Sequence, residues 1–523
     1  MRSLIAAALL ALLALPVDAQ DQAAPRPAGR NDGPWFGVPL PPRGAAPAVK
    51  VGTRPPRPAG SSGQLSEFMG SLIKADVETV VGFARAGALQ KEIGSGQMWG
   101  RIAGFPSGDR TVEWAVDEFR KAGIADVTTQ AITQDQKASL WLPLSWKVTL
   151  IGEPSSGAGS SDVVLESALP VGPSNIANGS MIAPLVYVGA ASPAVLRHID
   201  VRGKIAVQLI VPQGHMLFER RAVDSRSEEL MKRGAVGVFN LVRLPGNELS
   251  RDFSDCGNPC FNIGGRDGWF LESVLDRASQ SGTEVRARLD LQTRTYRGLK
   301  AMNGVARIRG ASDETIVLNA HVDGWFDGAG DNGDGLAVLI ALARHFAKPA
   351  NRPQRTIVFV ASAGHHTPGI NGPRSFVAAN PHLAKQAVML VNIEHVAQRN
   401  FSPARTTSAD GYREAVADSG EAPIAVGITN DSPFLQELID AGPARFGVNF
   451  ISERSTFQSG ETGGWAGLNV AKVSVMQAPP LYHTTGEVTD VISTPGLERM
   501  SRFLAFFVKE AGKAARAQIV PGS

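Results

Sequence analysis

Three ionisable side chains lie close together between a predicted strand and a predicted helix. Residues 315–320, TIVLNA, are apolar and rich in β-branched side chains, which is typical of a buried strand. His321 and Asp323 follow at once, and Asp331 comes after a glycine-rich loop. Open α/β sheets bind ligands at the carboxyl ends of their strands. The cluster therefore predicts a metal site or an acid–base site, although a turn that needs Asp and Gly for its geometry would explain Asp331 alone.

Three further strand-like runs also end in ionisable residues. They span residues 356–361, 387–393 and 471–476. The side chains that follow them are His365 and His366, then Glu394 and His395, and finally Tyr482 and His483. Parallel neighbouring strands end at one edge of a sheet, and zinc accepts His, Asp and Glu as ligands. We therefore expect a metal centre at this edge. His395 directly follows Glu394, so the alternation of side chains along a strand predicts that it points away from the site.

The length and composition favour a multidomain α/β protein. A chain of 523 residues is expected to form two or three domains, and 43% apolar residues support well-formed cores. Helical patterns at 64–90 and 109–122, together with the runs above, predict a mixed, mostly parallel sheet flanked by helices. The formal net charge of +3 is not that of a nucleic-acid-binding protein.

Short apolar runs divided by Gly and Pro occupy residues 161–290, which predicts a compact β-rich insert. The alternative is a continuation of the same domain. With the insert set apart, the main domain is expected to comprise residues 64–160 and 291–512, and residues 513–523 form a polar tail.

The N-terminal region has the composition of a targeting segment. Residues 1–19, MRSLIAAALLALLALPVDA, have a positive start, an apolar stretch and small residues at the end, as in a secretory signal. The apolar stretch is shorter than the ~20 residues of a membrane-spanning helix. We therefore expect a periplasmic or secreted protein without a membrane span. Residues 20–63 are rich in Pro and predict a disordered leader, with Trp35 and Phe36 as docking points.

The chain has two cysteines, Cys256 and Cys260. In an exported protein, a pair this close predicts one local disulfide. Zinc binding by the pair is the alternative, but it would need further ligands that are not nearby.

With these motifs, the chain resembles the co-catalytic zinc exopeptidases of the aminopeptidase, glutamate carboxypeptidase and transferrin-receptor type, over about residues 64–510. The matching segments are His321-Val322-Asp323, Asp331-Asn332, Asn392-Ile393-Glu394, Tyr482-His483-Thr484 and Arg101-Ile102-Ala103-Gly104. The insert resembles a protease-associated domain at residues 201–206 and 234–238, and such a domain is expected to contact substrate, a lid or another subunit.

The resemblance implies a site with one or two zinc ions. His321, Asp331 and Glu394 would hold one ion, and Asp331, His366 and His483 would hold the other. Asp323 would orient His321 as an outer carboxylate. A metal-bound water would then attack the scissile carbonyl of a peptide or small amide substrate.

The chain departs from the family at Gly364-His365-His366, where the family carries Gly-Glu-Glu. His366 can still bind zinc through nitrogen. His365 takes the place of the general base, and a neutral imidazole can accept a proton because its ordinary pKa is near 6.5, although nearby cations disfavour its protonated form. Two matched ligand carboxylates against two divalent ions leave net +2, whereas the family site has +1. We therefore hypothesise weaker binding at the His366 position or a single ion, unless Asp327 or Glu461 reaches the site.

These features predict an exported metal-dependent peptidase or amidohydrolase of the aminopeptidase-like type. The alternatives are a degenerate homologue that binds peptides without hydrolysis, and altered amide chemistry on the same fold. Trp325 and Phe326 are candidates for a substrate pocket wall, with ordinary loop packing as the alternative. Glu461 is a candidate for contact with a substrate ammonium, and Tyr482 is a candidate pocket aromatic.

Overall fold

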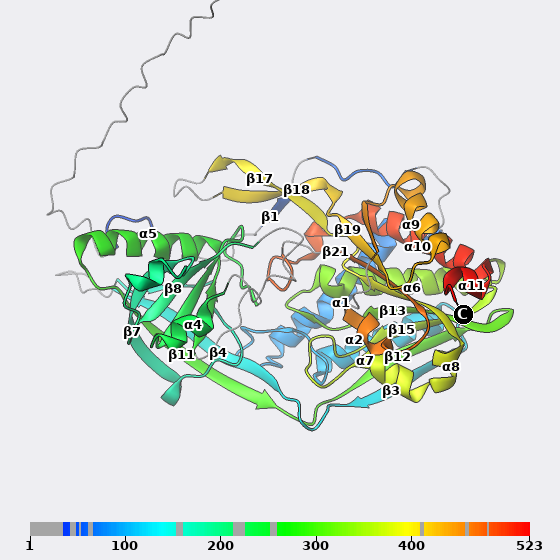
Figure 1. Ribbon diagram of the computed structural model, residues 1–523, viewed down its shortest axis with the longest axis horizontal. Coiled ribbons are helices and arrows are strands. Elements are labelled where there is room, and N and C mark those ends of the chain that lie inside the picture. Colours follow the sequence, from blue (N-terminus) through cyan, green and yellow to red (C-terminus); the bar gives the residue numbers. More distant parts are fainter. Residues whose placement is uncertain are drawn as a thin grey trace, which may run out of the picture.

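The computed structural model describes residues 35–41, 49–51, 54–60, 66–152, 161–212, 225–251, 259–407, 413–454, 460–477 and 481–522. The chain forms two lobes, each built on an eight-stranded sheet (Figure 1). The larger lobe, on the right of Figure 1, contains the C-terminal half of the chain. The smaller lobe is formed mainly by the segment coloured green.

The larger lobe is a mixed sheet with strand order β20-β19-β21-β16-β13-β15-β12-β3. Its strands are β3 (Asp126–Thr133), β12 (Lys300–Ile308), β13 (Ser312–His321), β15 (Arg355–Ser362), β16 (Ala387–Glu394), β19 (Ile424–Ile428), β20 (Phe450–Arg454) and β21 (Ala471–Gln477). Strands β21, β16, β13 and β15 are adjacent and parallel. The four predicted strands are therefore confirmed, and their carboxyl ends meet at one edge of the sheet.

Helices cover both faces of this sheet. The larger helical layer consists of α1 (Gly70–Leu89), α2 (Pro106–Lys121), α6 (Asp334–Phe346) and α10 (Thr494–Lys513). The opposite face packs against α7 (Gly372–Ala379), α8 (Pro381–Gln386) and the short helix η7 (Gly460–Trp465), and α9 (Pro433–Phe446) packs beside α10. Every residue of β15 and β16 is buried, because a central parallel strand has no face in water. This burial explains why these strands read as continuous apolar runs.

The smaller lobe has the strand order β5-β4-β11-β7-β8-β9-β10-β6. Its main elements are β4 (Leu140–Ile151), β7 (Ser180–Gly189), β8 (Ile205–Ile210), β9 (Gly237–Val242), β10 (Cys260–Ile263), β11 (Arg286–Tyr296), α4 (Ser227–Lys232) and α5 (Gly265–Ser281), with the short strands β5 (Val163–Val164) and β6 (Leu169–Pro170). Strands β4 and β11 pair along most of their length and lead directly from β3 and into β12. The second sheet thus includes strands outside the predicted insert range of 161–290.

Part of the predicted leader is ordered rather than disordered. β1 (Val49–Val51) pairs with β18 (Arg413–Glu421), which also pairs with β17 (Arg399–Thr407). The Trp35 ring is buried edge-on against Phe270 of α5, so its apolar surface is removed from water. The predicted signal, residues 1–19, lies outside the described residues.

Two further predictions concern membrane spans and the disulfide. Among the helices of the described ranges, none is long and apolar enough to cross a membrane. Cys260 is buried and disulfide-bonded, whereas its predicted partner Cys256 lies outside the described residues.

A buried ion-pair cluster fastens the start of the main domain to the end of α6. The Glu67 carboxylate accepts hydrogen bonds from Nδ1 of His345, at 2.8 Å, and from the Lys348 ammonium. The Phe68 ring stacks on the His345 ring. Burial alone would raise the pKa of Glu67, but the Lys348 and His345 hydrogen bonds outweigh burial and lower it to about 2.

Because the folded pKa of Glu67 lies below its unfolded value, its ionised form stabilises the fold above about pH 4.5, and this contribution is lost as the pH falls toward about 2. We expect Glu67→Gln to lower the free energy of unfolding by about 1–2 kcal/mol at pH 7. The difference from wild type should shrink between pH 4.5 and pH 3. Urea titrations of the zinc-free protein measure both effects. Glu284→Gln, at an exposed position, is the matched control, and an equal loss at both pH values would contradict the linkage.

Candidate metal centre

Asp331 is the centre of the site, because it is completely buried and imidazoles surround its carboxylate. Its Oδ2 lies 2.8 Å from Nε2 of His366 and 3.0 Å from Nε2 of His483. Its Oδ1 lies 3.3 Å from Nε2 of His321 and 3.5 Å from Nε2 of His395. These residues come from four separate strand ends or the loops that follow them, and they include His395, which the sequence predicted to point away from the site.

His321 is held in one tautomer by the chain itself. Its Nδ1 lies 2.9 Å from the backbone carbonyl oxygen of Asp323. A carbonyl can only accept, so Nδ1 carries a hydrogen. Burial opposes protonation of the ring, but the surrounding carboxylates outweigh it and raise the pKa of His321 well above its ordinary value, so Nε2 faces Asp331 and Glu394 with a proton that a cation would displace. The Nε2 of His321 and Oε1 of Glu394 are 3.7 Å apart.

The Asp323 carboxylate orients the neighbouring turn more directly than it orients His321. It accepts the backbone N–H of His365 at 3.2 Å and that of His366 at 2.7 Å, whereas it lies 3.7 Å from the His321 ring. Gly364 begins this turn at a φ of +95°, and a Cβ there would lie 2.4 Å from Ile370, so the turn requires glycine. Asp323 therefore fixes the two histidines that replace the family's glutamates.

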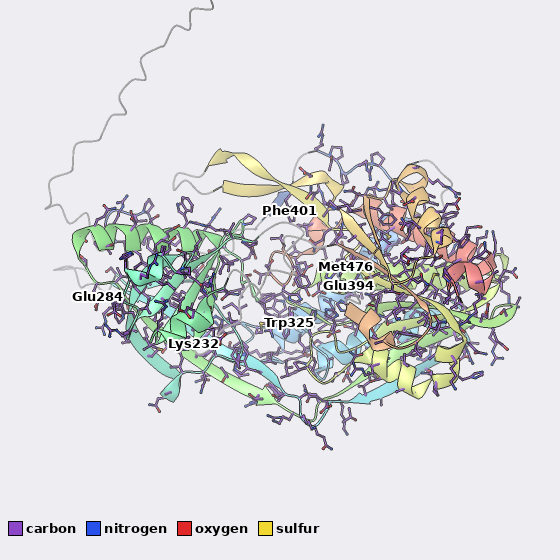
Figure 2. All side chains as sticks on the ribbon, viewed as in Figure 1. Lys232, Glu284, Trp325, Glu394, Phe401 and Met476 are labelled. Carbon is purple, nitrogen blue, oxygen red and sulfur yellow. The ribbon has the colours of Figure 1, made fainter. Side chains whose placement is uncertain are left out.

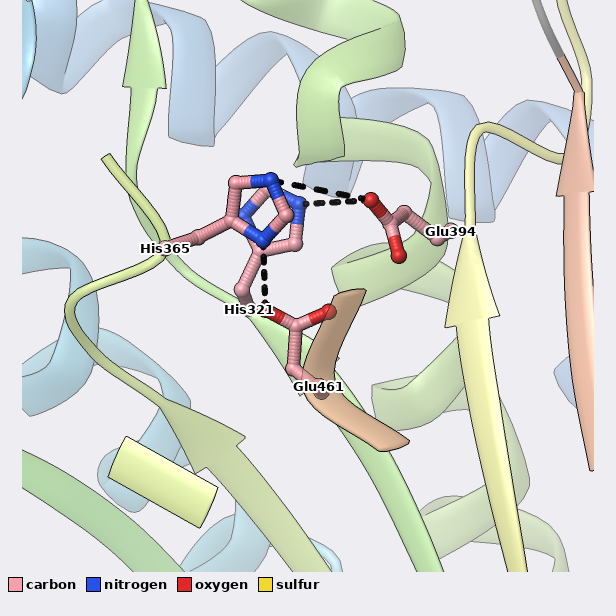
Figure 3. A group of neighbouring side chains, drawn as sticks. All are labelled: His321, His365, Glu394 and Glu461. Atoms are coloured by element: carbon pink, nitrogen blue, oxygen red, sulfur yellow. Dashed lines mark hydrogen bonds and ion pairs between the residues drawn. The ribbon is translucent and has the colours of Figure 1, made fainter. Parts of the chain in front are cut away.

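Glu461 of η7 reaches the site and contacts His365 (Figure 3). Its Oε1 lies 2.6 Å from Nδ1 of His365, and its Oε2 accepts from Asn392 at 3.3 Å. The other ring nitrogen of His365, Nε2, lies 3.9 Å from Oε1 of Glu394. Gly460 allows this approach, because a Cβ there would lie 2.8 Å from Oε2 of Glu394.

Arg101 supports residues 322–331, the segment that carries Asp331 and is called the metal loop here. Its fully buried guanidinium donates to four backbone carbonyls, those of Val322, Asp327, Gly328 and Asp331. Figure 1 places α1 and α2, on either side of Arg101 in the chain, beside α6. The positive charge also compensates for the buried acids around the loop.

Burial and mutual charges shift the acid–base behaviour of the site. Burial lowers the pKa of His366 to about 4 despite the neighbouring Asp331, so this imidazole is neutral near pH 7. Burial also opposes protonation of His365, but the Glu461 carboxylate outweighs it and raises the pKa to about 9. Burial would raise the pKa of Asp331 too, yet the surrounding imidazoles hold it well below its usual range.

The donor set fits zinc. Nitrogen and carboxylate ligand atoms lie within 4.8 Å of one another in two groups, one formed by His321, His365, Glu394 and Glu461, the other by His321, Asp331 and His366. Within the described residues, the buried Nε2 of His321 and Oδ1 of Asp331 make no hydrogen bond, although they face each other. An imidazole nitrogen and a carboxylate oxygen directed at each other are suited to hold a cation between them once the cation displaces the imidazole proton.

Several predicted residues lie elsewhere than expected. His395 points toward the site, with Nε2 3.4 Å from Glu394, because its φ of +52° reverses the strand's alternation. Asp327 pairs with Arg85 instead of reaching the metal ligands. Phe326 is completely buried against Trp99, which agrees with ordinary loop packing.

The remaining aromatic candidates lie beside metal ligands. Tyr482 stacks on His483 with ring centroids 3.5 Å apart, and Trp325 lies 5.8 Å from His366. Trp325 and Glu394 are found near the boundary between the lobes in Figure 2.

Two residues that contact the site's supporting segments, Asp334 and Arg251, were not predicted from the sequence. Asp334 accepts the backbone N–H groups of Val396 and Ala397 at 3.0 and 2.7 Å, and so holds the chain after Glu394. Burial raises the pKa of Asp334 to about 7. Its place three residues after Asp331, at the start of the helical pattern, was the available signal. Arg251 of the smaller lobe, which stacks 3.6 Å above the Trp325 ring, had no such signal.

Comparison with known proteins agrees with this geometry. Residues 303–508 match the model of Peptidase family M28. A probable glutamate carboxypeptidase, AMP1, of Arabidopsis thaliana is 28% identical over 200 residues, which are 36% of this chain and 27% of that protein. A glutamate carboxypeptidase 2 homolog of Caenorhabditis elegans is 28% identical over 206 residues, 36% of this chain and 25% of its own length. The chain thus spans about a quarter of the length of the curated relatives it matches.

Two solved structures share the fold over most of both chains. A Peptidase M28 precursor from Shewanella amazonensis has a TM-score of 0.59 at 18% identity and covers 85% of this chain and 98% of its own. BSAP, a zinc aminopeptidase from Bacillus subtilis, has a TM-score of 0.56 at 15% identity and covers 87% of this chain and 98% of its own. The family match and the shared fold support a co-catalytic zinc exopeptidase family for this chain. The match to Peptidase family M28 is limited to residues 303–508.

Replacing Arg101 tests how the metal loop is held. Lys has one ammonium and cannot reproduce a planar fork that reaches four carbonyls. We expect Arg101→Lys to lower the free energy of unfolding by about 2–4 kcal/mol and to weaken zinc binding, because Asp331 loses its support. Urea titration and competition with a zinc chelator measure the two effects. The exposed Arg120→Lys is the control, and wild-type zinc affinity in Arg101→Lys would refute the role.

Proposed function

We propose that the protein is a metal-dependent exopeptidase of the aminopeptidase-like type, which hydrolyses an amide bond in a peptide or small amide. The observation that carries this proposal is the buried Asp331 carboxylate, enclosed by Nε2 atoms of His321, His366 and His483. The family and the fold support the coarser class, a metallopeptidase-like hydrolase.

The residues that would hold zinc are His321, Asp331, His366, Glu394 and His483. Bound zinc lowers the pKa of a water molecule and polarises a carbonyl oxygen. The chain keeps His321 in the tautomer that leaves Nε2 available, and it keeps His366 neutral by burial. Asp323 positions the His366 backbone through its amide N–H.

His365 occupies the position of the expected proton acceptor. Its ring lies against that of His321, with centroids 4.2 Å apart, and Glu461 fixes its orientation. A neutral His365 could take a proton from the attacking water, but the Glu461 carboxylate raises the pKa of His365 to about 9 and so favours the protonated ring near pH 7. The same geometry allows a different role for His365 as a metal ligand, and the two roles make different predictions about zinc binding.

The substrate class is expected to be peptides or small amides with a free terminus. Trp325 and Tyr482 lie beside the ligands and are proposed to contact the substrate. Arg251 and Ser250 bring the smaller lobe to the same place, where the Arg251 backbone N–H donates to the His483 carbonyl at 3.1 Å. This contact supports a role for the smaller lobe, proposed here to be a protease-associated domain, at the substrate entrance.

Activity on a panel of aminoacyl and dipeptide amides tests the proposed function. The purified full chain, loaded with Zn²⁺, Mn²⁺ or Co²⁺, should hydrolyse at least one class of amide. Asp331→Asn should lower kcat/KM by at least about a hundredfold, because the carboxylate charge that holds the metal is lost. His382→Ala, at an exposed position outside the site, should behave as wild type.

The possible results separate the competing functions. Activity that survives Asp331→Asn unchanged would refute the metal-centred mechanism. Bound metal with no turnover on the whole panel would instead favour a degenerate homologue that binds peptides, which is the reading that the missing Gly-Glu-Glu motif raises.

We also propose that the protein is exported to the periplasm or secreted. The signal-like pattern at residues 1–19 and the disulfide-bonded Cys260 support export, because disulfides persist in oxidising compartments. We expect N-terminal sequencing of the mature protein to begin after Ala19. A mature chain that retains residues 1–19 in the cytoplasm would contradict this proposal.

A further inference from the structure

We infer that His365 is a metal ligand, and that Glu461 is the residue that positions it. In this arrangement, Nε2 of His321, Nε2 of His365 and Oε1 of Glu394 form one ligand set of two imidazoles and one carboxylate. The inference rests on the proposed metal-dependent function, but it assigns His365 a role other than proton acceptor.

The two imidazoles are arranged as a pair of ligands. Their rings are stacked with centroids 4.2 Å apart and planes 12° from parallel. Both Nε2 atoms are directed at the same oxygen, Oε1 of Glu394, at 3.7 Å for His321 and 3.9 Å for His365 (Figure 3). Ligand atoms about 2.0–2.1 Å from a tetrahedral zinc ion are roughly 3.3–3.5 Å apart. Each Nε2 is therefore within a few tenths of an ångström of the ligand spacing from Oε1 of Glu394, and the stacked rings would turn so that their lone pairs converge on one ion.

Glu461 prepares His365 for this role. Its carboxylate can only accept, so Nδ1 of His365 carries a hydrogen in their 2.6 Å contact. The proton at Nε2, which the raised pKa of about 9 retains near pH 7, is the one that zinc would displace, and the freed lone pair faces Glu394. A carboxylate behind a ligating histidine fixes the tautomer and raises the basicity of the ligand nitrogen. Asn392 fixes the relative positions of the two carboxylates, because its side-chain amide donates to Glu394 at 2.8 Å and to Glu461 at 3.3 Å.

The remaining ligands then form a second set of the same composition. His321 has a single Nε2 lone pair and its Nδ1 is already bonded to a carbonyl, so it serves one ion fully. His366 and His483 both face Oδ2 of Asp331, at 2.8 and 3.0 Å. Each set thus offers two histidines and one carboxylate, and Oδ1 of Asp331 lies 3.3 Å from His321, where the two sets meet.

With the ligands divided into these two sets, Glu461 supplies the negative charge that is lost when two histidines replace two glutamates. Two divalent ions with Asp331 and Glu394 leave net +2, and the buried Glu461 carboxylate reduces it to +1. That is the balance expected of a site with three ligand carboxylates. One carboxylate therefore acts at one remove from the metal. The imidazole of His365 would bind the ion, and the Glu461 carboxylate hydrogen-bonds to the other side of that imidazole.

Metal binding to the full chain, measured apart from activity, tests the assignment. The zinc-free protein is titrated with Zn²⁺ against a chelating indicator, and bound zinc is counted by elemental analysis. We expect wild type to bind two ions, with about two histidines per zinc by X-ray absorption. His365→Ala should lose one ion, and the zinc that remains should keep two histidines, because His366 and His483 belong to the other ligand set.

Glu461→Gln leaves both imidazoles in place and so keeps the test valid should His365→Ala fail to fold. It should weaken one zinc site by about ten- to a hundredfold. Glu461→Asp should recover part of that loss, whereas a purely structural role would leave the Co²⁺ absorption spectrum unchanged. His382→Ala is the control with wild-type binding.

Two outcomes distinguish this inference from the proposed function. If His365→Ala and Glu461→Gln both bind two zinc ions as tightly as wild type, His365 is not a ligand, although the metal-dependent function still stands. If wild type itself binds no zinc at micromolar concentration, the proposed metal-dependent function fails.

Discussion

The burial of the Asp331 carboxylate is the constraint on which the rest of the site depends. A charged carboxylate without exposure to water is costly unless its oxygens meet compensating partners. Its side chain faces His321, His366 and His483, while its backbone carbonyl accepts from Arg101. Three of the parallel strands, β13, β15 and β21, lead to the three histidines, because their carboxyl ends meet at one edge of the sheet. Fold and chemistry are joined at this point.

Substituting imidazole for carboxylate at residues 365 and 366 changes the charge of the site more than its shape. Burial keeps His366 neutral and available, while Glu461 controls which nitrogen of His365 faces the site. The carboxylate that the motif lost thus returns from a different part of the chain. A change at residues 364–366 can be interpreted only together with η7, almost a hundred residues later.

The sequence predicted the central strands and most of the candidate ligands, because both signals are local. A strand buried on both faces is a continuous apolar run, and ionisable residues directly after it must lie at the sheet edge. Glu461 and His395 were harder to place. The contact of Glu461 depends on how a distant loop folds back over Glu394, and the direction of His395 depends on one positive φ. Neither depends on a local pattern of residue types.

The smaller lobe makes direct contacts with residues of the candidate metal site. Ser250 pairs with Thr484, directly after His483, and the Arg251 guanidinium covers the Trp325 ring. The His483 loop is therefore held between the main sheet, which brings it to Asp331, and residues 250–251 of the other lobe. Any movement of the smaller lobe would act on a proposed ligand and on the aromatic ring beside His366 together. For this reason, a movement that changes substrate access would also change the geometry of the proposed metal ligands, through Ser250, Arg251 and the His483 loop.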